Sequence, residues 1–155
     1  LQIQAFDRLC DTLAQRSLAG RVISIHAVRS AGAVLDVLES HGLLIPNPDS
    51  PAIIFHWFSG TSNELARARN ANCYFSVNER MLATKRGREY ARQIPLDRLL
   101  LETDAPAEPN TETSAQSLIR SLARTSMRIA SLKNCDAKRI ESAVLANAHS
   151  VFDLR

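Results

Sequence analysis

Apolar residues follow two alternating patterns along this chain. Between residues 1 and 18 they recur every three to five positions, which is the spacing of an amphipathic helix with one buried stripe. Downstream, short apolar runs rich in β-branched residues alternate with longer amphipathic segments, and a proline-rich turn at 46–51 separates two of them. The short runs predict strands at 21–26, 52–56, 73–77 and 98–103, and the longer segments predict helices at 30–40, 62–71, 84–94, 112–132 and 136–149.

This order of elements predicts an α/β fold. Strand and helix alternate four times, which favours right-handed βα units in one parallel sheet. The strand runs are nearly continuously apolar, as is typical of strands that are buried on both faces. No internal repeat interrupts the chain, so residues 1–155 are predicted to form a single domain.

Composition narrows the class of protein without fixing its function. The 155 residues are 45% hydrophobic and 23% charged, as in an ordinary globular domain. Because the sequence has neither an apolar run of about 18 residues nor a secretory leader, we expect a soluble cytoplasmic protein without membrane contact. The net charge of +3 is compatible with a phosphate-bearing partner. The three cysteines lie far apart, which argues against a disulfide framework or a thiolate zinc site.

Polar side chains follow the predicted strands at the point where each strand ends. His26 closes the first strand, His56 closes the second, and Asp104 follows the fourth. The carboxyl ends of parallel strands share one edge, where α/β folds carry their active sites. Two imidazoles and a carboxylate are suitable ligands for zinc, manganese or magnesium, and a bound cation can activate water while Asp104 accepts a proton or holds the metal. Taken singly, either histidine is better explained as a polar residue beneath a loop.

Longer motifs around these residues resemble those of a known family. The stretches His56-Trp-Phe-Ser-Gly60 and Leu100-Leu-Glu-Thr-Asp-Ala-Pro106, the strand that ends in His26, and Asn147 followed by Phe152 are similar to motifs of the TatD family of metal-dependent deoxyribonucleases. The resemblance implies a (β/α)₈ barrel, of the TIM-barrel type, with a two-metal site that hydrolyses DNA phosphodiester bonds. It also implies that His26 and His56 bind the second metal, and that Asp104 helps to hold the first and acts as the acid or base for water.

Two motifs of that family are absent from this sequence. There is no His-x-His pair and no Glu-x-Gly-Leu-Asp segment, which the family carries at the ends of its first and fourth strands. A complete barrel also needs eight strands and about 250 residues. The chain therefore resembles the carboxyl-terminal half of the barrel, with four βα units, and the amino-terminal half and half of the metal site are missing. Since two-metal hydrolysis requires both cations, we expect this half alone to be badly impaired or inactive unless another segment supplies the remaining ligands.

Two other functions stay open on these observations. One is a truncated or degenerate relative that is catalytically silent and acts by binding or by assembling with a partner. The other is a barrel hydrolase that acts on an amide or an ester, because a fold and a metal set do not determine the substrate.

Basic and aromatic residues near the predicted site are candidates for contacts with DNA. Arg29 stands three residues after the first-strand histidine, one more than is usual in the family, and either clamps a phosphate or is solvated. Arg80 begins a basic stretch that fits either a nucleic-acid backbone or a solvated helix face. Trp57 is explained equally well by base stacking and by a place in the pocket wall. Together with Ser59 of the aromatic motif, the predicted substrate-binding set is Arg29, Ser59 and Arg80.

A half barrel also predicts association with another chain. Eight strands close a barrel so that no edge is exposed, whereas four strands leave two unpaired edges. We expect an open apolar face formed by Val22, Ser24, Ile53, Phe55 and the run 99–101. Such a surface favours self-association or complementation by the missing half of the barrel. The apolar residues at helical spacing in the last two helices are predicted to be buried core: Leu118, Ile119, Leu122, Met127, Ile129, Ile140, Val144 and Leu145.

Overall fold

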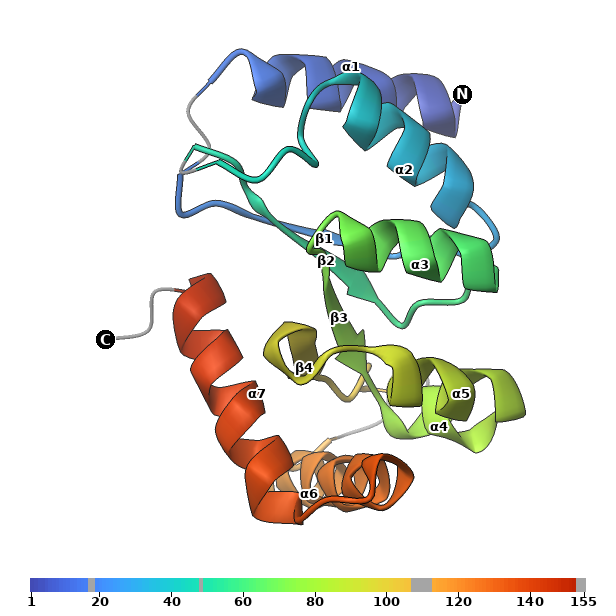
Figure 1. Ribbon diagram of the computed structural model, residues 1–155, viewed down its shortest axis with the longest axis vertical. Helices are drawn as coiled ribbons and strands as arrows, with labels where there is room; N and C mark the ends of the chain where they lie inside the picture. The colour runs from blue at the N-terminus through green and yellow to red at the C-terminus, as the bar shows by residue number, and fades with distance from the viewer. Residues whose placement is uncertain (17–18, 48, 107–112, 153–155) are drawn as a thin grey trace.

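A sheet of four parallel strands, in the order β1-β2-β3-β4, forms the centre of the computed structural model (Figure 1). The structure describes residues 1–16, 19–47, 49–106 and 113–152. Apolar residues are aligned across the sheet, where Phe55 lies beside Ile25 and Phe75, and Phe75 beside Leu99. The predicted α/β fold with four parallel βα units is therefore confirmed. The strands are β1 (Val22–Ile25), β2 (Ala52–His56), β3 (Tyr74–Val77) and β4 (Leu99–Leu101).

One helix more than predicted connects these strands. Between β3 and the predicted helix at 84–94 the structure has a separate short helix, α4. The side chain of Asn78 caps α4 by accepting a hydrogen bond from the backbone of Met81 at 2.7 Å, and Thr84 caps α5 by accepting one from Gly87 at 2.9 Å. Two capping residues close together thus produce two helices. The helices are α1 (Gln2–Ala14), α2 (Ala31–Ser40), α3 (Ser62–Asn70), α4 (Glu79–Ala83), α5 (Lys85–Gln93), the 3₁₀ turn η1 (Leu96–Arg98), α6 (Ala115–Lys133) and α7 (Ala137–Phe152).

Some predicted boundaries fall outside the described residues. These are the end of the first helix at residue 18, residue 48 of the proline-rich turn, and the start of the penultimate helix at residue 112. Within the described ranges, none of the helices combines the length and the apolar character needed to cross a bilayer.

The main hydrophobic core lies on one face of the sheet, beneath helices that include α2, α3 and α5. Phe55 and Leu99 are fully buried there, and Ile53 is 4% exposed. This corrects the predicted open apolar face, to which these three residues were assigned. Neighbouring residues of a strand point to opposite faces, and the register aligns Val22 with Ala52 rather than with Ile53. Ile53 and Phe55 therefore face the helices, whereas Val22 and Ser24 face the other side of the sheet.

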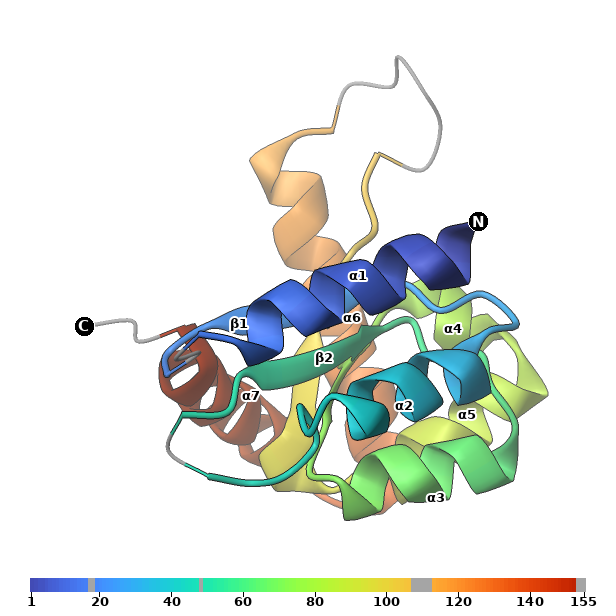
Figure 2. The ribbon, with the colours of Figure 1, turned by 90° about the horizontal axis from the view of Figure 1, so that it is seen from above.

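The end of α7 covers part of the opposite face. Ile54 and Leu100 are 4% and 5% exposed, and they pack against Val151 of α7. Figure 1 shows α7 on the other side of the sheet from α2 and α3, and Figure 2 shows it at the opposite end of the view from α4 and the N-terminus. Ser24 remains exposed on this side. The open apolar face is accordingly narrower than the sequence predicts.

Both outer strands have an open side in the described part of the chain, because β1 and β4 each pair with one neighbour. Beside β4, Leu101, Leu122 and Leu145 contribute to a groove of about 330 Å³ between α6 and α7. Only part of the apolar stripe of α6 and α7 is buried, so the prediction that all of its residues are core is partly wrong. Ile129 and Ile140 are buried, whereas Ile119, Met127 and Leu145 are 58%, 63% and 60% exposed.

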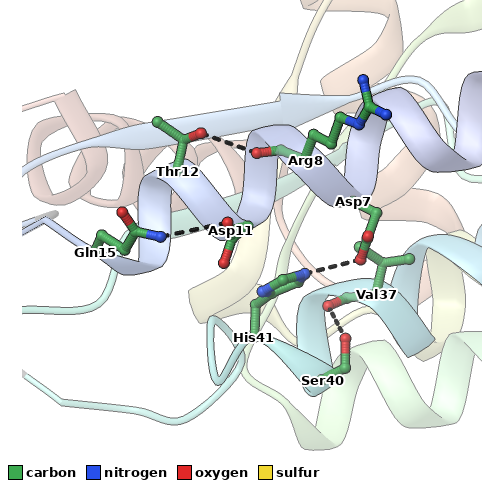
Figure 3. A network of polar contacts seen from close by, with 8 residues as sticks. All are labelled: Asp7, Arg8, Asp11, Thr12, Gln15, Val37, Ser40 and His41. Atoms are coloured by element: carbon green, nitrogen blue, oxygen red, sulfur yellow. Dashed lines mark hydrogen bonds and ion pairs between the residues drawn. The ribbon is translucent and has the colours of Figure 1, made fainter.

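A polar contact joins α1 to the end of α2 (Figure 3). Nε2 of His41 lies 2.9 Å from Oδ1 of Asp7, and Cys10 is fully buried on the same helix as Asp7. Because α2 leads back to the amino end of β2, His41 lies away from the carboxyl edge of the sheet. This histidine therefore has a structural contact and no place in the candidate site.

A carboxylate ties α4 to α6. Glu79 accepts hydrogen bonds from Nε and Nη2 of Arg124 at 2.7 and 2.9 Å, and from Oγ of Ser121 at 2.6 Å. The Arg124 guanidinium, followed by the Ser121 hydroxyl, lowers the pKa of Glu79 to about 2. Since Glu79 is the first residue of α4, these contacts fix that helix where it leaves the sheet.

We expect Glu79→Gln to lower the free energy of unfolding by about 1 kcal/mol at pH 7, because the partly exposed pair loses its charge-assisted hydrogen bonds. The melting temperature should then fall by about 2–4 °C. A folded-state pKa below the ordinary 4.5 stabilises the protein above about pH 4.5, and this contribution is lost as the pH falls toward 2. The difference in melting temperature between the wild-type protein and Glu79→Gln should therefore be larger at pH 7 than at pH 3. Glu89→Gln, in an exposed pair with Arg92, is the control and should change the melting temperature at neither pH. An equal effect of Glu79→Gln at both pH values would contradict a stabilising role for the ionised Glu79 carboxylate.

Candidate functional site

The carboxyl ends of the strands carry several polar side chains. His26 follows β1, His56 is the last residue of β2, and Glu102 and Asp104 follow β4. At three of these ends a residue other than glycine has a left-handed backbone: Arg29 with φ of 54°, Trp57 with 44° and Asp104 with 51°. Such a conformation is unfavourable for bulky residues and is concentrated at functional sites. The chain therefore turns sharply at each of these residues, and neighbouring side chains point in different directions.

His56 lies between two carboxylates. Its Nδ1 is 3.0 Å from Oε1 of Glu102, and its Nε2 is 3.3 Å from Oδ1 of Asp104. One ligand atom from each of the three residues lies within 4.8 Å of the others. The side chains of His56, Glu102 and Asp104 are 23%, 13% and 37% exposed, so the group is partly buried but remains accessible to solvent.

Glu102 was not singled out as a site residue from the sequence, although it belongs to the motif that ends in Pro106. Both of its carboxylate oxygens are buried, and Nδ1 of His56 lies 3.0 Å from Oε1. Burial raises the pKa of Glu102, and the electrostatic interaction with His56 and a hydrogen bond with Asn78 oppose this shift. A buried carboxylate is costly unless hydrogen-bond donors or a cation balance its charge. The available signal was strand alternation, which puts Glu102 on the same face as Leu100.

His26 lies beside this cluster. Its ring centroid is 5.0 Å from that of His56, with an angle of 56° between the ring planes. The structure thus brings together His26, His56 and Asp104, the three residues expected at one edge. His26 is exposed, and the group that could share a single cation consists of His56, Glu102 and Asp104.

The three predicted substrate-binding residues have different surroundings. Nη1 of Arg80 lies 3.8 Å from Oδ2 of Asp104, which puts a positive charge beside the cluster. Ser59 donates a hydrogen bond to the carbonyl oxygen of Ala27 at 3.3 Å and so ties the loop after β2 to the end of β1. Arg29 is exposed, and the structure gives it no ion pair among the described residues.

The cluster fits a divalent cation. Protein nitrogen and oxygen ligands lie about 2.0–2.6 Å from zinc, magnesium or calcium, so atoms as close as these three can surround one ion. An imidazole suits zinc and manganese, and carboxylates suit the harder magnesium and manganese ions. The carboxylates of Glu102 and Asp104 would supply the negative charge that such an ion requires.

Comparison with known sequences is consistent with this chemistry. The family described as TatD related DNase matches residues 1–153. A protein named Deoxyribonuclease Tat-D from Schizosaccharomyces pombe is 42% identical over 82 residues, which make up 53% of this chain and 25% of that protein. A protein named 3'-5' ssDNA/RNA exonuclease TatD from Citrobacter rodentium is 29% identical over 112 residues, which make up 67% of this chain and 43% of that protein. The chain therefore spans less than half the length of these relatives.

A solved structure has the same arrangement of elements. The crystal structure of a hydrolase of the TatD family from Entamoeba histolytica superposes with a TM-score of 0.73 at 19% sequence identity. The match covers 93% of this chain and 54% of that one. At this level of identity the likeness concerns the fold, and it extends over about half of the larger protein.

Proposed function

Because the chain belongs to the TatD family of related DNases, we propose that it forms part of a metal-dependent hydrolase that cleaves phosphodiester bonds of DNA with metal-activated water. The observation that carries the proposal is the position of His56 between the buried carboxylate of Glu102 and the more exposed carboxylate of Asp104. The name of the Citrobacter rodentium relative includes single-stranded DNA and RNA, which makes a single strand the first substrate to test.

In this proposal His56, Glu102 and Asp104 would hold a magnesium, manganese or zinc ion, and His26, whose ring lies beside that of His56, would bind a second cation with ligands from outside this chain. A bound cation of this kind lowers the pKa of its water and offsets charge on the phosphate. Asp104, the most exposed of the three, takes up a proton from the attacking water on a carboxylate oxygen. Glu102 orients the His56 ring through Nδ1, which leaves Nε2 toward Asp104.

Substrate binding is assigned to Arg29, Ser59 and Arg80. Arg80 is close enough to Asp104 to contact a phosphate held at the cluster. Arg29 is exposed after β1 and free to reach the same phosphate from the other side. Ser59 acts through its hydrogen bond to Ala27, which holds the loop beside His26 in place.

The proposal includes completion of the barrel by further strands. The sheet has four strands where a TIM-type barrel has eight, and β1 and β4 each have an open side. The exposed apolar residues beside β4 and the groove between α6 and α7 support association there, with a second copy of the chain or with a complementary half. Only a complementary half that carries the His-x-His and glutamate motifs would supply the remaining ligands of a two-metal site, because a second copy of this chain lacks both.

Nuclease assays with single-stranded DNA test this function. The chain should be assayed alone and after mixing with a separately produced amino-terminal half of the Entamoeba histolytica relative, each with Mn²⁺ or Mg²⁺ and with EDTA. We expect metal-dependent cleavage that EDTA abolishes and that is strongest in the mixture. Faster hydrolysis of ester or amide substrates would favour the alternative hydrolase, and absence of both Mn²⁺ binding and cleavage would identify a catalytically silent relative.

A further inference from the structure

A cavity of about 370 Å³ lies next to the candidate metal cluster. Two pairs of neighbouring residues connect them, because His56 belongs to the cluster while Trp57 lines the cavity, and Arg80 faces Asp104 while Met81 lines the cavity. The volume is within the range of about 300–1,000 Å³ that is usual for small-molecule sites. A group bound in the cavity would therefore lie in the same region of the carboxyl edge as the cluster.

Fixed aromatic rings form the inner wall of the cavity. Phe58 is 4% exposed and makes edge contacts with Phe55 and Tyr90, at centroid distances of 5.5 and 5.7 Å. Tyr90 is itself fixed, since its hydroxyl donates a hydrogen bond to the carbonyl oxygen of Gly60 at 2.8 Å. Trp57 is half-buried, so part of its indole ring is accessible. The wall is thus preorganised, with one large aromatic side chain at its edge.

Positive charge lies at the rim. Arg86 lines the cavity from the first turn of α5 and is exposed. Glu89, the only acid of α5, pairs instead with Arg92 at 2.9 Å. Arg88 is also engaged, because it donates hydrogen bonds to the carbonyl oxygens of Leu82 and Ala83. Arg86 is therefore the guanidinium of this helix that is available to an anion at the cavity.

We propose that this cavity is a nucleobase subsite for a single-stranded nucleic acid, in which a base stacks on Trp57 and Arg86 contacts the adjoining phosphate. The inference rests on the proposed function, since it assumes a nucleic-acid chain whose phosphate reaches the cluster. An accessible aromatic face combined with a nearby cation is the chemistry of single-strand binding, and it tolerates any base because every base has a π face. Arg86 adds a salt-dependent contact that carries no sequence information.

Trp57 is the single tryptophan of the chain, so its emission reports on the site directly. The protein is titrated in EDTA with a ten-nucleotide oligothymidylate and with an oligomer of equal length that contains abasic sites throughout. Tryptophan emission measures stacking, and the anisotropy of a labelled oligomer measures binding. We expect oligothymidylate, but not the abasic oligomer, to quench the tryptophan emission. The Kd should be about ten-fold lower for oligothymidylate than for the abasic oligomer.

Substitutions separate stacking from charge. Trp57→Ala should raise the Kd for oligothymidylate about ten-fold and leave the abasic Kd unchanged, whereas Trp57→Phe should retain most of the affinity. Arg86→Gln should weaken binding of both oligomers and reduce the slope of log affinity against log salt by about 0.7. Arg8→Gln, at an exposed arginine of α1, is the control and should change neither Kd. Unchanged circular dichroism shows that each variant is folded.

The outcomes distinguish this inference from the proposed function. Equal affinity for the two oligomers without quenching overturns the subsite and leaves a nuclease possible. Failure of both oligomers to bind also overturns the subsite, while metal-dependent cleavage still decides the nuclease. Base-dependent quenching in a protein that never cleaves DNA supports the subsite and overturns the nuclease.

Discussion

Replacement of His56 by alanine should lower metal-dependent DNA cleavage by about 10²–10³-fold. Loss of an outer residue that merely orients a metal ligand costs about 10–100-fold, and His56 would be a ligand itself. The imidazole lies within 3.3 Å of carboxylate oxygens on both sides, so its removal also leaves Glu102 and Asp104 facing each other without the intervening group. Cleavage should be measured in the mixture with the amino-terminal half, with Mn²⁺ as the metal.

His41→Ala is the matched control for this prediction. It removes the same side chain from a position that pairs with Asp7, away from the carboxyl edge, and should leave cleavage unchanged. Calorimetric titration of Mn²⁺ adds a readout that does not depend on activity, and His56→Ala should weaken Mn²⁺ binding while His41→Ala does not. Full cleavage by His56→Ala would exclude this residue from the metal site.

Gly87→Ala should destabilise the fold, although alanine is the better helix former. The Cβ atom would lie 1.9 Å from the carbonyl oxygen of Met81 and 2.7 Å from its carbonyl carbon, so the backbone of α4 would have to move. Overpacking of this kind costs about 1–3 kcal/mol or more, and a clash with backbone belongs at the upper end. Alanine recovers about 1 kcal/mol through helix propensity. A net loss of about 2 kcal/mol should lower the melting temperature by about 4–8 °C.

Gly32→Ala provides a comparison within another helix. Its Cβ would lie 2.5 Å from Oε1 of Glu64, so this side chain would have to shift and weaken the hydrogen bond that Oε2 accepts from the Thr61 backbone, while no backbone atom is in the way. The melting temperature should therefore change by only about 2–4 °C, corresponding to at most about 1 kcal/mol. Equal effects of the two substitutions would show that α4 adapts easily to α5. A larger effect at Gly87 would confirm that close contact between these helices is required.

Much of the fold could be predicted because its strands carry local signals. The run Ala52–His56 is short, apolar and β-branched, and the structure gives β2 the same bounds. The two faces of the sheet could not be separated in the same way, since face depends on register between strands that are far apart in sequence. Ile53 and Ser24 were grouped on one face, whereas Ser24 pairs with Ile54.

The site was predictable to a similar extent. A histidine at the end of a strand indicates its own position, and His26 and His56 do lie side by side. The role of Glu102 depends on geometry that no local pattern contains. Its carboxylate lies 3.0 Å from Nδ1 of His56 although β3 separates β4 from β2 in the sheet. The sequence thus predicted the edge of the sheet at which the cluster lies, whereas the tertiary structure was needed to identify Glu102 as part of it.

The left-handed backbone at Trp57 has an evolutionary consequence. Because the chain turns at this residue, two consecutive side chains lie in separate environments, with His56 in the cluster and Trp57 in the cavity wall. A point mutation at Trp57 can alter what the cavity accepts while the imidazole keeps its place. An insertion between the two would displace both at once. Selection can therefore diversify ligand preference here by substitution, whereas changes in loop length are constrained.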